Sequence, residues 1–109
     1  MYRAKQGDII WLNFNPQAGN EQSGRRPALI ISNDETNEFL RVGAMVCPIT
    51  NNDKGIPIQV PLDSRTKTQG VIMCDQTKIL NIKARNAEFI ETAPEDIIWE
   101  VADIIKGFL

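Results

Sequence analysis

The stretch Gly7-Asp-Ile-Ile-Trp-Leu-Asn-Phe14 contains the clearest indication of the fold. Its apolar residues alternate between the two faces of a strand, with Ile9 and Trp11 on one face and Ile10, Leu12 and Phe14 on the other. A strand that is apolar on both faces has to be covered on both sides. We therefore expect residues 7–14 to form a central or well-covered strand.

Further apolar runs continue this pattern and predict strands at 28–32, 42–49, 71–74, 78–82 and 87–90. Residues 56–62 also alternate, but Pro57 and Pro61 cannot donate hydrogen bonds to a neighbouring strand, so we expect an edge strand there. Residues 33–39 resemble one short helix. The polar stretch 15–27 is rich in turn residues and predicts a long loop.

The last part of the chain has helical periodicity. Thr92-Ala-Pro-Glu95 matches a capping box, and apolar residues follow at helical spacing, namely Ile97, Ile98, Val101, Ile104, Ile105 and Phe108. Five to seven short strands with one terminal amphipathic helix predict a mainly β fold, a small and strongly bent antiparallel barrel. At 109 residues the chain is long enough for a single domain, 1–109.

Composition restricts the chemistry. The chain has no histidine, and Cys47 and Cys74 lack the spacing of a metal site, so we expect buried free thiols, no metal and no cofactor. No apolar run is long enough to cross a bilayer and none follows the charged start, which predicts a cytoplasmic protein without membrane contact. The net charge is −2, yet residues 1–85 have 11 Lys/Arg against 8 Asp/Glu. A local phosphate site on one face fits this distribution.

Three polar segments could carry chemistry. Residues 18–27 place Glu21 and two amide side chains beside Arg25 and Arg26, which suit phosphate oxygens; the alternative is a solvated loop in which Glu21 pairs with an arginine. Thr50 ends a strand, where it can donate to a phosphate or serve only in a turn. Residues 74–78 interrupt two apolar runs and can read base edges, or else Asp75 caps a turn.

In combination these segments resemble the MazF/PemK toxin family over nearly the whole chain. The matching pieces are Gly7-Asp-Ile-Ile-Trp-Leu, Asn15-Pro16, Gly19-Asn-Glu-Gln-Ser-Gly-Arg-Arg-Pro-Ala-Leu-Ile30, Val46-Cys-Pro-Ile-Thr50, Gly70-Val-Ile-Met-Cys-Asp-Gln76 and Ile82-Lys-Ala-Arg85. The resemblance implies a homodimer of SH3-like barrels of the CcdB/PemK type. It also implies an endoribonuclease toxin that cuts single-stranded mRNA at short motifs without a metal.

The resemblance assigns roles to individual residues. Arg26 and Thr50 match the MazF-like catalytic pair, which acts during attack of the ribose 2′-hydroxyl and leaves 2′,3′-cyclic phosphate and 5′-hydroxyl ends. The general base stays open between Glu21 and Asp75, because a carboxylate of ordinary pKa, about 4, is a weak base at neutral pH. The candidates for RNA binding are Asn20, Gln22, Arg25, Asn52, Gln76 and Lys78.

Two positions depart from the PemK pattern, since Asn20 and Met73 stand where PemK-type toxins have His and Arg. The PemK-type acid/base set is therefore incomplete, and we prefer the MazF-like pair. Two other hypotheses remain: a toxin of the same fold that inhibits a protein such as DNA gyrase, and a catalytically inactive relic. The CcdB-type poisons end in Trp-Gly-Ile, whereas this sequence ends Lys106-Gly-Phe-Leu109.

Partners follow from the same resemblance. A toxin needs an antitoxin, and we expect one of the MazE type whose acidic, disordered tail presents carboxylates to Arg25 and Arg26. Aromatic side chains for stacking look scarce, because most of them lie in apolar runs and are assigned to the core; they are Tyr2, Trp11, Phe14, Phe39, Phe89, Trp99 and Phe108. Trp99 lies one position off the apolar helical stripe and is a candidate for a partner interface.

Overall fold

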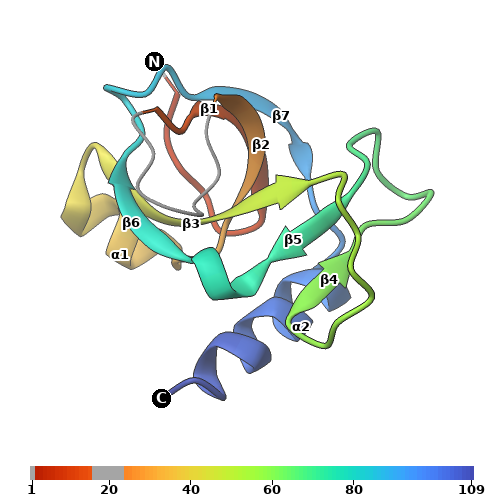
Figure 1. The fold of residues 1–109 in the computed structure, drawn as a ribbon. Coiled ribbons are helices and arrows are strands. Elements are labelled where there is room, and N and C mark those ends of the chain that lie inside the picture. The colour runs from red at the N-terminus through yellow and green to blue at the C-terminus, as the bar shows by residue number, and fades with distance from the viewer. Residues whose placement is uncertain (1, 16–23) are drawn as a thin grey trace.

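The computed structural model describes residues 2–15 and 24–109. Within them it contains β1 (Asp8–Asn13), β2 (Arg25–Ile30), α1 (Asp34–Leu40), β3 (Gly43–Thr50), β4 (Gln59–Pro61), β5 (Val71–Met73), a 3-10 helix (Cys74–Gln76), β6 (Lys78–Asn81), β7 (Glu88–Thr92) and α2 (Glu95–Lys106) (Figure 1). The predicted mainly β class and terminal helix are confirmed. Neither of the two described α-helices has the length and apolar character needed to cross a membrane.

Antiparallel pairing joins all seven strands into one bent sheet. The strand order is β4-β5-β3-β2-β1-β7, and β6 also pairs with β3. The predicted edge strand is confirmed, because β4 ends the sheet and contains only three residues, the last of them Pro61. Since β4 offers so little backbone for further pairing, the described strands do not close into a ring, and the expected barrel is open at this edge.

Apolar side chains pack on both faces of the sheet. One core lies between the sheet and α2 and includes Ile9, Leu29, Ile49, Ile97 and Val101. The second core fills the inside of the bend and includes Ile10, Leu12, Phe14, Ile30 and Val46. Because Ile9 contributes to the first core and Ile10 to the second, the prediction that β1 is covered on both sides is confirmed.

The two predicted helices form, but only α1 begins with a side chain that caps its backbone N–H groups. At α1 the side chain of Asn33 accepts a hydrogen bond from the backbone N–H of Thr36 at 2.8 Å, as expected of an N-cap. The predicted capping box before α2 is wrong. Thr92 remains in β7, where it pairs with Asp8, and α2 begins after Pro94 without a side-chain cap.

Assignment of most aromatic residues to the core is also wrong. Phe14 is buried, but Trp11, Phe39, Phe89 and Phe108 are exposed. Trp11 shows the physical reason: it shares a strand face with Ile9, but Ile9 belongs to the core that includes α2 residues and Trp11 does not. Alternation in the sequence gives the face of a side chain, but it does not say how far the covering helix reaches.

The burial of Ile97, a residue of α2, leads to a prediction about stability. Ile97 is 3% exposed, so Ile97→Ala removes core packing and leaves a cavity; we expect the free energy of unfolding in urea to fall by about 2–5 kcal/mol. Ile79→Ala is the matched control, because Ile79 is 56% exposed, and it is expected to lower that free energy by about 1 kcal/mol or less. Equal losses in the two variants would contradict the placement of α2.

Candidate nucleic-acid interface

Strands β2 and β3 bring Arg26 and Thr50 to the same end of the sheet. The last recorded pair between these strands joins Ala28 to Pro48, and Arg26 and Thr50 lie two residues beyond it on each strand. Thr50 is buried, and its Oγ1 accepts a hydrogen bond from the backbone N–H of Asn52 at 3.2 Å. A hydroxyl that accepts in this way keeps its own proton for donation to another oxygen.

Gly70 fixes the backbone at Thr50. Val71, the first residue of β5, pairs with Thr50, and Gly70 precedes it with a φ of +121°. A Cβ atom at position 70 would lie 2.5 Å from the carbonyl oxygen of Thr50, which is closer than any real Cβ contact. Only glycine allows both this backbone conformation and the close approach of β5 to the end of β3.

An open cleft of about 510 Å³ lies beside this end of the sheet. Its described lining combines cations, amides and apolar groups: Trp11, Arg25, Arg26, Pro27, Ile49, Asn51, Lys67, Thr68, Gln69 and Ile90. Both chain neighbours of Thr50 are among them. Three of these residues are cationic and none is acidic, so this part of the cleft is suited to binding an anion.

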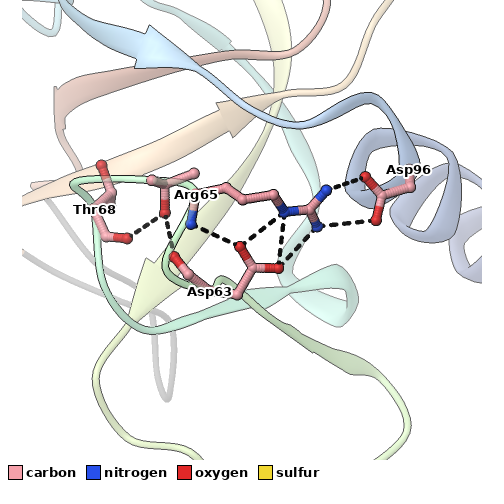
Figure 2. Close-up of polar contacts among 5 residues, drawn as sticks. Asp63, Arg65, Thr68 and Asp96 are labelled. Atoms are coloured by element: carbon pink, nitrogen blue, oxygen red, sulfur yellow. Dashed lines mark hydrogen bonds and ion pairs between the residues drawn. The ribbon is translucent and has the colours of Figure 1, made fainter.

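One wall of the cleft is the connection between β4 and β5, which is tied to α2. The guanidinium of Arg65 donates to Asp63 and, at 2.8 and 3.0 Å, to both carboxylate oxygens of Asp96 at the start of α2 (Figure 2). Hydrogen bonding to Arg65 lowers the pKa of Asp63 to about 2 and also lowers that of Asp96. The hydroxyl of Thr66 closes the turn by donating to the carbonyl oxygens of Asp63 and Thr68.

A second tie joins the same loop to β7. Glu91 accepts hydrogen bonds from the backbone N–H of Lys67 at 3.0 Å, and from the N–H and hydroxyl of Thr68 at 2.8 and 2.7 Å. Desolvation raises the pKa of Glu91, but these hydrogen bonds outweigh it and hold the pKa below its ordinary value. The loop that carries Lys67, Thr68 and Gln69 is therefore fixed from two sides.

Some of the predicted site residues lie together. Arg25 and Arg26 both line the cleft, as do Ile49 and Asn51, the chain neighbours of Thr50. Asn52, two residues after Thr50 in the chain, is exposed and is not among the lining residues. Arg25 forms an ion pair with Glu88 of β7, at 3.4 Å. Three predicted residues lie outside the described part of the chain, namely Asn20, Glu21 and Gln22.

Three other predicted residues lie elsewhere. Asp75 and Gln76 belong to the 3-10 helix, which packs against α2 and β4. Lys78 begins β6 and pairs with Val46. None of the three is among the described lining residues of the cleft, and, unlike Thr50 and Asn52, none of them adjoins a lining residue in the chain.

Part of the cleft was not predicted from the sequence. Trp11 was assigned to the core, and Lys67, Thr68 and Gln69 were not considered, because residues 63–70 have neither periodicity nor a recognisable motif. The only indication in the sequence is a polar run with two cations between two strands. Glu91, which holds this run in place, is more than 20 residues away, a separation that no local pattern reveals.

Among residues 2–15 and 24–109, the thiols and acidic groups form no second candidate site. Cys47 and Cys74 are buried and free, as predicted, and burial raises the pKa of Cys47 to about 12 and that of Cys74 to about 11. Thiols with such pKa values are poor nucleophiles at neutral pH. Within the described residues no cluster of three or more His, Cys, Asp or Glu is arranged to hold a metal ion.

Fold and cleft define a small, mainly β protein with a cleft at the end of its sheet whose described lining is cationic. Residues 5–109 match the PemK-like, MazF-like toxin family of type II toxin–antitoxin systems, and the chain belongs to this family. The endoribonuclease toxin MazF of Escherichia coli K12 is 38% identical over 98 residues, 88% of this chain and 86% of MazF. The endoribonuclease PemK of Escherichia coli is 36% identical over 109 residues, 96% of this chain and 81% of PemK.

Solved structures agree with this assignment. The crystal structure of MazF from Deinococcus radiodurans superimposes with a TM-score of 0.92 at 37% identity, covering 99% of this chain and 97% of that one. A MazE–MazF crystal structure from the same organism gives a TM-score of 0.86 at 37% identity, covering 99% and 96%. The family predicted from the sequence motifs is confirmed.

The contact between Gly70 and Thr50 is tested by substitution. Gly70→Ala forces a strained backbone and a clash with a backbone oxygen, whereas Gly55→Ala introduces the same side chain at a φ of +64° with nothing within 4 Å. We expect Gly55→Ala to lower the free energy of unfolding by about 1–2 kcal/mol and Gly70→Ala to lower it by more. Chemical denaturation measures both; equal losses would mean that the approach of β5 to Thr50 imposes no constraint.

The pKa of Glu91 predicts a pH dependence. Because this pKa lies below its ordinary value of 4.5 in the folded protein, the carboxylate stabilises the fold fully above about pH 4.5, and this stabilisation is lost as pH falls through the lowered pKa. Wild-type protein should therefore lose more stability between pH 7 and pH 3 than Glu91→Gln does. Urea unfolding across that range measures the difference, with Glu38→Gln on the exposed face of α1 as control. If the free energy of unfolding changes with pH in parallel for wild type and Glu91→Gln, the predicted contribution of Glu91 is contradicted.

Proposed function

We propose that the chain is a sequence-specific, metal-independent endoribonuclease toxin that cuts single-stranded mRNA. The observation that carries the proposal is the position of Arg26 and Thr50 at the ends of β2 and β3, beside a cleft whose described lining has three cations and no carboxylate. Its family relatives in Escherichia coli are named endoribonucleases. A cationic cleft open to solvent is also what a flexible, anionic strand requires.

The proposed reaction needs no group from outside the chain and the RNA. The ribose 2′-oxygen attacks the adjacent phosphorus as its proton is removed, the bond from phosphorus to the 5′-oxygen breaks, and the leaving oxygen takes up a proton. The products are a 2′,3′-cyclic phosphate and a 5′-hydroxyl. Arg26 would offset the negative charge that builds on the phosphoryl oxygens, and Thr50 would donate its hydroxyl proton to one of them.

The general base remains a choice between Glu21 and Asp75. Asp75 is exposed in the 3-10 helix and does not line the described part of the cleft, whereas Glu21 lies outside the described residues. Arg25 and Asn52 are proposed to bind the RNA close to the cut. Asn20 and Gln22 are also proposed to bind the RNA, and both lie outside the described residues. Gln76 and Lys78 would contact the strand further away, because neither lines the cleft and neither is next to a lining residue in the chain, whereas Asn52 follows the lining residue Asn51.

Assembly and inhibition belong to the same proposal. We propose that the toxin acts as a homodimer and that a MazE-like antitoxin inhibits it. MazE–MazF complexes are among the matching structures, which supports a partner of this kind. An acidic antitoxin segment would compete with RNA for Arg25 and Arg26, since carboxylates and phosphates both accept from a guanidinium.

Cleavage of a long unstructured RNA in EDTA tests the proposal. We expect purified protein to cut at a recurring short motif and to leave cyclic phosphate ends. Arg26→Ala and Thr50→Ala each remove a group that stabilises the transition state, so each should lower the cleavage rate by about 100-fold or more. Gel analysis with identification of the product ends measures both effects.

The control is Lys106→Ala, which removes a cation from the last turn of α2, away from the cleft, and should cut at the wild-type rate. An inert wild-type protein that still arrests growth on expression would refute the nuclease. A protein target such as DNA gyrase would then be the first to examine. Full activity in Arg26→Ala or Thr50→Ala would refute the proposed catalytic pair while leaving the nuclease intact.

A further inference from the structure

We infer that Trp11 and Lys67 form a nucleotide-binding subsite beside Arg26 and Thr50, in which the indole stacks on a base and the ammonium group binds a backbone phosphate. The inference rests on the proposed function, because it assigns to that substrate two residues that the cleavage chemistry does not use. Both residues line the same cleft as Arg26. They come from β1 and from the loop between β4 and β5, two segments that are far apart in the sequence.

Trp11 lies in an unusual place for a tryptophan. It is 40% exposed, although it sits in a strand paired on both sides, opposite Pro27 on β2 and Glu88 on β7. Its neighbour on the same strand face, Ile9, is fully buried. A flat, rigid ring at the wall of an open, cationic cleft provides a surface on which a nucleic-acid base can stack, whatever the base.

Hydrogen bonds from the backbone of its loop fix the position of Lys67. Its N–H donates to Glu91, and the next residue, Thr68, donates to the same carboxylate twice, so Glu91 is occupied with holding the loop. The charge of the Lys67 ammonium helps to lower the pKa of Glu91, but among the described residues this group is not in any of the ion pairs of Arg25 and Arg65. A cation on a fixed loop loses less conformational freedom when it binds a phosphate than one on a free loop does.

The rest of the loop is fixed as well, which makes the subsite preformed. Arg65 joins the loop to the first turn of α2 through Asp96, with Asp63 completing the bridge (Figure 2). Thr68, whose hydroxyl donates to Glu91, and Gln69 complete this wall of the cleft. Stacking also requires an unpaired base, because the bases of a duplex are stacked on one another; the subsite therefore selects single strands.

Tryptophan fluorescence offers a direct test. The chain has two tryptophans, so Trp99→Phe leaves Trp11 as the only one. The probe is a mixed-sequence pool of short 2′-O-methyl RNA, which lacks the hydroxyl needed for cleavage. We expect it to quench the emission of Trp11 on binding, whereas inorganic polyphosphate, which has charge but no bases, should not. Binding of the RNA pool without quenching would refute stacking on Trp11.

The affinity for the same RNA pool measures the contributions of Trp11 and Lys67 separately. Trp11→Leu should weaken binding by about tenfold or more, with Trp11→Phe recovering part of the loss. Lys67→Ala should weaken it too, and should reduce the slope of log affinity against log salt by about 0.7, the value for one phosphate contact on a single strand. Phe39→Ala and Lys106→Ala are the controls: α1 lies on the opposite side of the molecule from the loop (Figure 1), and Lys106 does not line the cleft.

Kinetics distinguish failure of this inference from failure of the proposed function. If the subsite is real, Lys67→Ala and Trp11→Leu raise the KM for RNA cleavage more than they lower kcat. If wild-type protein cuts RNA and Lys67→Ala has wild-type KM and affinity, the subsite is refuted and the nuclease stands. Lys67 lies in an exposed loop, so this variant remains informative even if Trp11→Leu fails to fold. If wild-type protein cuts no RNA, the proposed function fails, and fluorescence still decides whether Trp11 binds it.

Discussion

Strand β3 has partners along both of its edges, and the position of the cleft depends on that arrangement. β2 pairs with one edge, while β6 and then β5 pair with the other, so β3 changes partner along its length. At the end of β3 where β5 replaces β6 as its partner, Thr50 lies opposite Val71. Because Gly70 has no side chain, the carbonyl oxygen of Thr50 can lie close to it. A backbone fixed on both sides holds a side chain to the small tolerance that positioning against a phosphate requires.

The sequence predicts those parts of the fold that depend on neighbours along the chain. Alternation in residues 7–14 identified a strand covered on both faces, and Pro57 with Pro61 identified the edge strand β4. The helical spacing after residue 95 identified α2. Motifs around Arg26 and Thr50 pointed to the family, and strand pairing brings these two residues to one end of the sheet. In each case a local pattern carries the information.

What the sequence did not predict depends on contacts between distant segments. Trp11 has the alternation of a core residue, but it is exposed, whereas Ile9 on the same strand face is buried in the core that includes α2 residues. Thr92 has the spacing of a capping residue, but pairing with Asp8 keeps it in β7. Residues 63–70 become a wall of the cleft through Glu91 and Asp96, which belong to β7 and α2. Long-range contacts of this kind override local preference.

The acidic end of the chain helps to build the cationic cleft, which explains how a protein of net charge −2 can present one. Asp96 holds Arg65, and Glu91 is occupied by the backbone and hydroxyl groups of the loop. Glu88 pairs with Arg25 at 3.4 Å, and both side chains are largely exposed. An exposed pair of this kind is worth about 0–1 kcal/mol, so it holds Arg25 without preventing a phosphate or a partner's carboxylate from displacing Glu88. The charge at the cleft therefore depends on which carboxylates already bind groups of the protein, and the net charge of the chain does not predict it.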